Sequence, residues 1–544
     1  MWKRITKALV AGLMGLNAWL SAPMAHAEIP PIDPSIEQTL TISTASELSI
    51  MDSLLYDDVP TSDMLGQTFE GLYRVVDGND VELGQAASVD ISEDGMTYTF
   101  KLRDDIFWSN GDPVTAEDFE YTYQRIVDPS SGSSAQSSEV FKNATAIREG
   151  DLEVSELGVK ALDDKTLEIQ LEYAAPYFPK LLTGSRFLPV NKKFVEEKGD
   201  QYGTSAENIV SNGPFKMEGW NGTNLEWKLT KNDHYWDKEH VYLEDVNVHV
   251  VKEASTGADL FDAGQLDYAV LTDEFVAQYD GSENFHSVSK AMIGYMSFNT
   301  QREATGNAKI RRAIAQAIDK ELYADSVIQD GSIPLNGLVP LNFDLSEDGL
   351  DYREEAGDML VYDLDQAKKD WEEGKKELGI DSLELELLIN DQGLSKRTAE
   401  FVQAQLEENL EGLKLTIRSV PLKNRLEFQR ASDFDIFYGT WAPDYQEAMN
   451  FLEQYTTDGG TNFAKYSNEE YDRHIDEARH EFANDPAKRR ESLIAAEKIG
   501  IQEDAVMAPL YQGATSYLLA DNVEGFQILP IGRTINLRTT YIAE

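Results

Sequence analysis

The sequence predicts a globular α/β protein of two or three domains, and three observations lead to that class. The chain has 544 residues, enough for more than one hydrophobic core. It is 41% hydrophobic and 10% aromatic, so burial offsets the entropy of folding despite a formal net charge of -49. Segment 383–417 alternates, becomes helical and alternates again, which predicts a βαβ unit with two parallel strands.

The N-terminal residues have the pattern of a secretory signal peptide. Basic residues precede an apolar run over 8–20, and the small-residue signature Ala25-His26-Ala27 follows that run. The apolar run is shorter than the roughly 20 residues that a transmembrane helix needs. We therefore expect cleavage after Ala27 and export to the periplasm or to the outer face of the cell membrane. No cysteine follows the run, so no lipid anchor is expected.

Residues 28–35 read as a proline-rich tether, after which the alternation over 39–42 predicts the first strand. A second strand is expected over 96–102, behind a Glu-Asp-Gly turn. A capping box at Thr115 then begins a helix that ends before Pro129. Further along, apolar periodicity predicts helices over 310–322, 398–410, 468–482 and 486–501, and an apolar strand over 434–441.

The composition excludes several functions. With 97 Asp and Glu against 48 Lys and Arg, the surface repels phosphate groups, so neither nucleic-acid binding nor docking on anionic lipid is expected. The absence of cysteine removes disulfides, thiolate nucleophiles and cysteine zinc sites. The sequence also lacks the common motifs of serine hydrolases, zinc proteases and nucleotide-binding enzymes, so we expect no cofactor.

Three weaker patterns have ordinary explanations. Asp344, Ser346, Asp348 and Glu355 have the spacing of a calcium-binding loop, but Pro334 and Pro340 forbid the helix that should enter it. The two histidines His474 and His480 are six residues apart and do not share a helix face, so no metal site is expected there. Paired acidic residues leave a secreted hydrolase open as an alternative.

The stretch over 87–119 reads ASVDISEDGMTYTFKLRDDIFWSNGDPVTAEDF. It resembles the signature of the family 5 extracellular solute-binding proteins, which include the oligopeptide- and dipeptide-binding receptors of ABC importers. The resemblance implies a two-lobe fold of the type II periplasmic-binding-protein kind, with an extra domain and a hinge that closes over the ligand. Transferred to this chain, the first lobe comprises 28–69, 194–295 and 513–544, the extra domain 70–193, and the second lobe 296–512.

The resemblance also implies a site. Oligopeptide binders of the family carry a Trp-x-x-Asp-Tyr segment whose Asp pairs with the α-ammonium group of the peptide, and this chain has Trp441-Ala442-Pro443-Asp444-Tyr445. Backbone at 57–59 and 440–442 is expected to sandwich the ligand. Some relatives carry, at the position of Tyr438, a basic residue that meets the C-terminal carboxylate of the peptide. In this chain only the neighbouring Arg430 offers a substitute for that residue. The peptide-binding residues expected by similarity are Asp57, Val59, Arg430, Tyr438, Thr440, Trp441, Ala442, Asp444 and Tyr445.

The resulting hypothesis is a monomeric, non-enzymatic receptor that captures peptides and delivers them to an integral-membrane ABC permease. The main alternative keeps the fold and changes the cargo to a signalling peptide, a nickel chelate, haem or an oligosaccharide. Independently of the resemblance, ligands of open α/β sheets bind beyond the carboxyl ends of the strands. The turn over 441–445 follows an expected strand, and both arguments therefore place the ligand at this turn.

Overall fold

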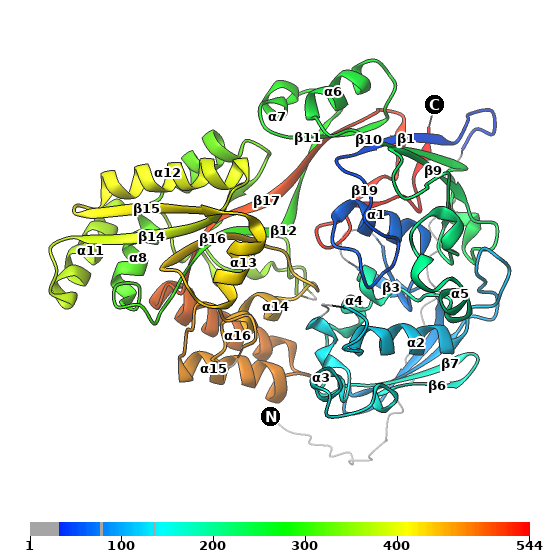
Figure 1. Ribbon diagram of the computed structural model, residues 1–544, viewed down its shortest axis with the longest axis horizontal. Helices are drawn as coiled ribbons and strands as arrows, with labels where there is room; N and C mark the ends of the chain where they lie inside the picture. The colour runs from blue at the N-terminus through cyan, green and yellow to red at the C-terminus, as the bar shows by residue number, and fades with distance from the viewer. Residues whose placement is uncertain (1–31, 77–79, 134–135, 347, 458, 544) are drawn as a thin grey trace, which may run out of the picture.

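One mixed sheet of eleven strands runs through the molecule (Figure 1). Its two longest strands, β12 (Phe285–Phe298) and β17 (Met507–Leu519), pair antiparallel at its middle. The pairing is irregular between Ser289 and Tyr295. The expected leader over 1–27 lies outside the described residues. The computed structural model describes residues 32–76, 80–133, 136–346, 348–457 and 459–543.

On each side of β12 and β17 the sheet belongs to a different hydrophobic core. The first core gathers buried residues from 40–268 and 517–542, and the second gathers residues from 291–511. Tyr445 is the exception, since it packs in the first core although its neighbours in the sequence build the second. Figure 1 shows β12 and β17 running between the two halves of the molecule.

Gly294 explains how these two central strands approach so closely. A Cβ atom at this position would lie 1.9 Å from the ring of Tyr511, so only glycine fits opposite that tyrosine. Gly294 pairs with Tyr511 within an irregular stretch of the β12–β17 ladder. Irregularities of this kind bend a strand and increase its twist. The crossing between the two cores is thus the least regular part of the central ladder.

The second core confirms the βαβ prediction. Strand β14 (Leu383–Asn390) pairs parallel with β15 (Leu413–Val420) in the register Leu383 to Leu413. Helix α12 (Gly393–Asn409) connects them and begins five residues before the expected start. The apolar strand expected before the turn is also present as β16 (Ile436–Trp441), which pairs with both β14 and β12.

The prediction of a single helix over 310–322 is wrong at its C-terminal end. The structure has α8 (Ala308–Gln316) and a separate turn α9 (Lys320–Tyr323). Asp319 causes the break, because its carboxylate accepts a hydrogen bond from the N–H of Leu322 and caps a new turn. Leu322 is 47% exposed, so the apolar face that packs on the core ends before it.

The helix expected from Thr115 is confirmed as α2 (Ala116–Val127), where Asp118 accepts a hydrogen bond from the N–H of Thr115 at 3.0 Å. It contacts β6 and β7 of a four-stranded antiparallel sheet, whose order is β4-β5-β7-β6. The strand expected over 96–102 is the second strand of this sheet. The strands of the sheet are β4 (Ala86–Ile91), β5 (Thr97–Leu102), β6 (Val159–Asp163) and β7 (Thr166–Gln170).

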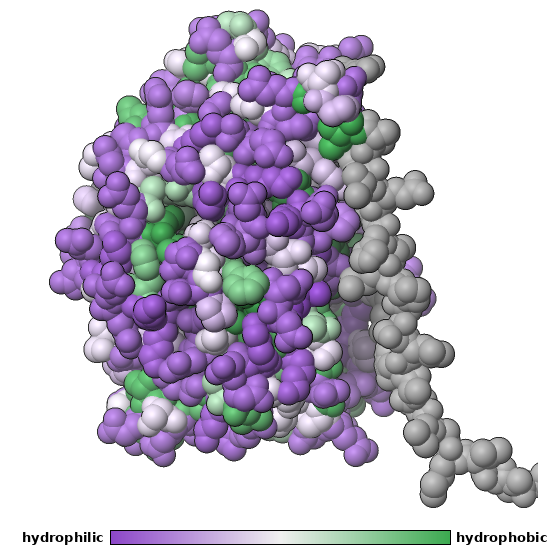
Figure 2. All heavy atoms as spheres, turned by 90° about the vertical axis from the view of Figure 1, so that its right-hand side faces the viewer, coloured by the Kyte–Doolittle hydropathy of each residue, from purple (hydrophilic) through white to green (hydrophobic). Residues whose placement is uncertain are grey.

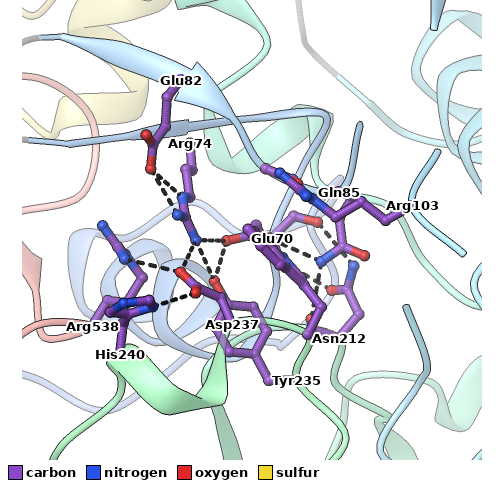
Figure 3. Close-up of polar contacts among 12 residues, drawn as sticks. Glu70, Arg74, Glu82, Gln85, Arg103, Asn212, Tyr235, Asp237, His240 and Arg538 are labelled. Atoms are coloured by element: carbon purple, nitrogen blue, oxygen red, sulfur yellow. Dashed lines mark hydrogen bonds and ion pairs between the residues drawn. The ribbon is translucent and has the colours of Figure 1, made fainter. Parts of the chain in front are cut away.

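A buried ionic network fixes the first core to the C-terminal segment (Figure 3). Arg74 pairs with Glu82 and Asp237, each at 2.7 Å, and with Glu70 at 3.4 Å. Asp237 also pairs with Arg538 at 3.3 Å. Glu70 accepts further hydrogen bonds, from Gln85, Tyr235 and Trp236. We call this set of residues the Glu70 network.

The face of the molecule in Figure 2 is mostly hydrophilic, with apolar groups scattered over it. That pattern agrees with the excess of acidic residues in the sequence. Within the described residues, no helix has both the length and the apolar character to cross a bilayer.

The remaining strands and helices complete the two halves. The other strands are β1 (Thr39–Thr44), β2 (Tyr73–Val75), β3 (Val81–Leu83), β8 (Phe215–Glu218), β9 (Glu226–Lys231), β10 (Asp245–Val250), β11 (Tyr268–Leu271), β13 (Ile333–Pro334), β18 (Val523–Glu524), β19 (Gln527–Ile528), β20 (Ile535–Asn536) and β21 (Tyr541–Ile542). The other helices are α1 (Val59–Thr68), α3 (Ala144–Glu149), α4 (Phe178–Leu181), α5 (Lys192–Lys198), α6 (Ala254–Asp262), α7 (Glu274–Tyr279), α10 (Tyr352–Ala356), α11 (Leu364–Leu378), α13 (Leu422–Arg430), α14 (Met449–Leu452), α15 (Glu469–Asp476) and α16 (Pro486–Glu497).

Candidate functional site

The turn that follows β16 is held by a buried side chain. Asn450 is 5% exposed, and its amide oxygen accepts a hydrogen bond from the N–H of Asp444 at 2.8 Å. The Tyr445 hydroxyl donates to Glu453 at 3.0 Å, and the amide of Asn450 donates to the same carboxylate. These bonds fix the backbone of the turn, and none of them involves the Asp444 carboxylate.

The calcium-like loop has a structural role at this turn. Asp344 accepts a hydrogen bond from the N–H of Ala448 at 2.8 Å. The guanidinium group of Arg490 bridges Asp344 at 3.3 Å and Glu355 at 2.5 Å, which are the first and twelfth positions of the loop. An arginine side chain thus neutralises these carboxylates, and Asp344 orients the backbone just after Tyr445.

Neither histidine of the weak pair stands in a metal-like cluster. His474 lies beside Glu477, and His480 packs edge-on against the ring of Tyr173. The described part of the chain contains no group of three or more residues arranged to hold a metal ion.

Three cavities meet around the turn. The acidic cavity, of about 700 Å³, has carboxylates Glu139, Glu172, Asp444, Glu453, Asp472 and Asp476 in its wall. The basic cavity, of about 130 Å³, is lined by Lys180, Arg186 and Arg533 together with Asp444. The inner cavity, of about 170 Å³, contains Thr440, Trp441, Arg425 and Gln429. Asp444 is therefore common to the acidic and basic cavities, and Trp441 to the acidic and inner ones.

Asp444 has an unusual environment for a carboxylate. Solvent reaches its side chain within the cleft, yet the carboxylate forms no ion pair and no hydrogen bond with any residue that the structure describes. The hydrogen bond to Asn450 comes from the backbone N–H of Asp444. Burial raises the pKa of Asp444; the positive charge of Arg186 opposes the rise, and the negative charge of Glu453 adds to it. A partly desolvated carboxylate without a cationic partner is complementary to a ligand that brings a cation.

The two halves of the molecule touch across the cleft at this turn. The rings of Tyr177 and Tyr445 stack with centroids 3.9 Å apart and planes 10° apart. The ammonium group of Lys180 donates to the carbonyl oxygen of Gln446 at 3.2 Å. These contacts explain why Tyr445 belongs to the first core, and they make the turn part of the wall between the halves.

The structure brings some of the expected residues together and separates others. Thr440, Trp441, Asp444 and Tyr445 all line the cavities. Ala442 is exposed on the same turn.

The segment 57–59, whose backbone was expected to contact the ligand, leads into a helix, because Val59 begins helix α1 and is 52% exposed. Asp57 is exposed as well, and the neighbour that lines the basic cavity is Tyr56. Asp58 explains the local fold, since its carboxylate accepts the N–H of Thr61 at 2.7 Å and caps the helix.

The two residues expected at the peptide carboxylate lie elsewhere. Arg430 ends α13 and is exposed, and within the described residues it makes no hydrogen bond or ion pair. Tyr438 is 2% exposed in the second core, with its hydroxyl 3.5 Å from that of Tyr511. The cation in the inner cavity is Arg425, which is 7% exposed.

The guanidinium group of Arg425 has no anionic partner among the described residues. One guanidinium nitrogen donates to the carbonyl of Tyr438 at 3.3 Å, while Nε has no partner. The amide oxygen of Gln429, in the same cavity, is also buried without a partner. Burial lowers the pKa of Arg425, because protein surrounds its charge. Buried polar groups are normally paired, so these two unpaired groups make the inner cavity a candidate ligand site.

The sequence analysis missed Arg425, Lys180, Arg186 and Arg533 as site residues. They lie in segments far apart in the chain, and no spacing connects them with Trp441 to Tyr445. The available signal was the composition of the chain, in which the 48 Lys and Arg are far fewer than the 97 Asp and Glu.

Comparison with known proteins agrees with this geometry. Residues 80–463 match the model of the bacterial extracellular solute-binding proteins, family 5. A curated dipeptide-binding protein from Lactococcus lactis is 31% identical over 93% of this chain and 95% of its own length.

Solved structures agree as well. The OppA protein of Listeria monocytogenes, solved with a bound peptide, is 38% identical with a TM-score of 0.77, over 93% of this chain and 99% of that one. The substrate-binding domain of an oligopeptide ABC transporter from Bacillus anthracis is 38% identical with a TM-score of 0.79, over 94% and 100%. The fold is the type II binding-protein fold predicted by the sequence, and the chain belongs to family 5 of the bacterial extracellular solute-binding proteins.

Proposed function

We propose that this protein is an extracytoplasmic receptor that captures peptides with a free amino terminus and delivers them to an ABC permease. The observation that carries the proposal is Asp444, a carboxylate without a cationic partner that lies where two cavities meet. A peptide α-ammonium group supplies the missing cation. The names of the similar proteins, which describe dipeptide and oligopeptide binding, support the same cargo.

The other end of the peptide is assigned to Arg425 in place of Arg430. A receptor that accepts many sequences recognises what all peptides share, namely main-chain amides and the two terminal charges. Arg425 supplies a buried cation, and Gln429 supplies an amide whose oxygen still lacks a donor. Trp441 lines both the acidic and the inner cavity, so a peptide held by Asp444 and Arg425 lies along the end of β16.

Binding is proposed to close two lobes. The first lobe comprises 28–69, 194–295 and 513–544, with an extra domain at 70–193, and the second lobe comprises 296–512. The irregular pairing of β12 with β17 near Tyr295 supports a hinge at that place. Small-angle scattering tests closure, because a saturating peptide mixture should decrease the radius of gyration, and an unchanged radius at saturation would contradict it.

The receptor is proposed to act as a monomer, without cofactor, metal or catalysis, after export by the 1–27 leader. Native mass spectrometry of freshly purified protein tests cargo and chemistry together. Bound masses should correspond to peptides, and a labelled peptide should return intact after prolonged incubation. Masses of a haem, a nickel chelate or a sugar would favour the alternative cargoes, whereas cleaved peptide would favour the hydrolase.

A further inference from the structure

The basic cavity has a charge opposite to that of the chain. Over the whole sequence, 97 acidic residues face 48 Lys and Arg. In the wall of the basic cavity, Lys180, Arg186 and Arg533 face one carboxylate, Asp444. A cavity lined by chance would follow the composition of the chain and be mainly acidic. The reversal indicates a site that is built to hold negative charge.

None of these three cations forms an ion pair with a residue that the structure describes. Lys180 donates to the carbonyl of Gln446, and Arg186 donates to the carbonyls of Leu54 at 2.9 Å and Tyr56 at 3.3 Å. Nε of Arg533 is buried and has no partner. Neutral carbonyls orient Lys180 and Arg186, but they do not neutralise them.

Arg533 is the most confined of the three. Its side chain lies over helix α1 at Gly66, where a Cβ atom would come within 2.2 Å of its Cδ atom. Burial lowers the pKa of Arg533, and the nearby charges of Asp63 and Glu70 offset part of that change without forming an ion pair. The guanidinium group is therefore held in place before any anion arrives.

The position of Asp444 limits which part of a peptide reaches this cavity. Asp444 lines it, so a peptide whose ammonium group pairs with Asp444 has its first residue at the entrance. Side chains of an extended peptide alternate between two faces, and the third Cα lies on the order of 7 Å from the first. The first two side chains would lie nearest to Asp444, and in an extended peptide one of them would turn toward the basic cavity and the other toward the acidic cavity.

We propose that the basic cavity binds the carboxylate side chain of an acidic residue at the first or second position of the peptide. This proposal rests on the proposed function and adds a side-chain preference to it. The volume of about 130 Å³ is sufficient. A buried water needs roughly 10–15 Å³ of such space, so an aspartate or glutamate side chain fits with waters beside it.

The test is calorimetry with alanine peptides of three and five residues that carry Glu or Gln at position one, two or three. Charge-assisted hydrogen bonds are about twice as strong as neutral ones. At one of the first two positions, the Glu peptide should bind roughly tenfold or more tightly than its Gln partner. At position three the two should bind equally, and this comparison controls for repulsion by the net charge of the protein.

Two variants assign the preference to the cavity. Lys180→Gln and Arg533→Gln should each reduce the Glu-to-Gln ratio severalfold. The ratio is taken within each variant, so a general change in affinity cancels, and binding of the all-alanine peptide reports correct folding. Lys414→Gln is the matched control, because Lys414 is an exposed cation that pairs with Glu384 at 2.7 Å.

Equal affinities for Glu and Gln at both of the first two positions would overturn the inference. If the all-alanine peptides bind in that case, the proposed function stands and only the side-chain preference fails. If no peptide of either length binds, the proposed function itself fails. An unchanged Glu-to-Gln ratio in both cavity variants would also overturn the assignment to Lys180 and Arg533.

Discussion

Two groups of buried cations in this protein differ in one respect, namely whether the protein supplies the anion. In the Glu70 network, Arg74 contacts three carboxylates, and Arg538 shares Asp237 with it (Figure 3). Around the cleft, Arg425 and Arg533 form no ion pair within the described residues. Both groups are largely withdrawn from water, so the difference does not arise from exposure alone.

Under the proposed function, the difference separates charges that hold the fold together from charges that are left for a ligand. An isolated buried charge is costly, and proteins normally compensate it with a partner of opposite sign. Where the chain supplies the partner, the network connects segments of the fold. Where the chain supplies no partner, the desolvation cost of the buried charge persists until a ligand brings the opposite charge.

Glu70→Gln should produce the largest effect, and it should be an effect on stability. The substitution keeps the shape of the side chain but removes one anion next to Arg74. Breaking a buried ion pair costs about 3 to 5 kcal/mol, and we expect about 3 because Arg74 keeps two other carboxylates. Denaturant unfolding measures the loss. The affinity for the all-alanine peptide should stay unchanged, and a loss of affinity with unchanged stability would contradict the structural role.

Arg425→Gln should show the opposite pattern. The stability should be unchanged or higher, because the variant removes a desolvated cation that has no anionic partner. The affinity for peptides with a free carboxylate should fall by roughly 10- to 100-fold, the range of a hydrogen bond to a charged group. Peptides amidated at the C-terminus should bind the variant and the native protein alike. Equal losses for free and amidated peptides would show that Arg425 does not contact the carboxylate.

The pH dependence of binding should be smaller and should depend on Asp444. Its pKa is raised from the ordinary value of 3.8, and the ammonium group pairs only with the ionised form. Affinity should therefore be constant above the raised pKa and fall as the pH drops through it, by about tenfold one pH unit below. Calorimetry in buffers of different pH measures the slope. The slope should disappear in Asp444→Asn, and its persistence there would assign it to another group.

The strands that the sequence predicts depend on local patterns of apolar residues. The βαβ unit appears where alternation predicts it, and strand β16 appears where an apolar run predicts it. The helix over 310–322 failed because its apolar spacing continues to Leu322, past Asp319, which caps a new turn. One capping carboxylate thus overrides a pattern of apolar residues.

The candidate site was predictable only where it is continuous in sequence. The turn with Trp441 and Asp444 was found by its motif, and in the structure both residues line the acidic cavity. Arg425 was missed in favour of Arg430, although both lie on α13, because exposure distinguishes them and the sequence does not show exposure. The cations of the basic cavity come from segments more than 340 residues apart, as Lys180 and Arg533 illustrate. Only the folded chain brings such residues together.

The most direct test of the account is a cycle over Asp444 and the amino terminus of the peptide. Four affinities are measured: native protein and Asp444→Asn, each with a free and with an N-acetylated peptide. The loss of one partner of a desolvated charge pair costs on the order of 2 to 5 kcal/mol, about 30-fold to several thousand-fold in affinity. Acetylation should therefore weaken binding to the native protein strongly and to Asp444→Asn much less. Equal losses in both proteins would show that Asp444 does not contact the ammonium group and would contradict the account.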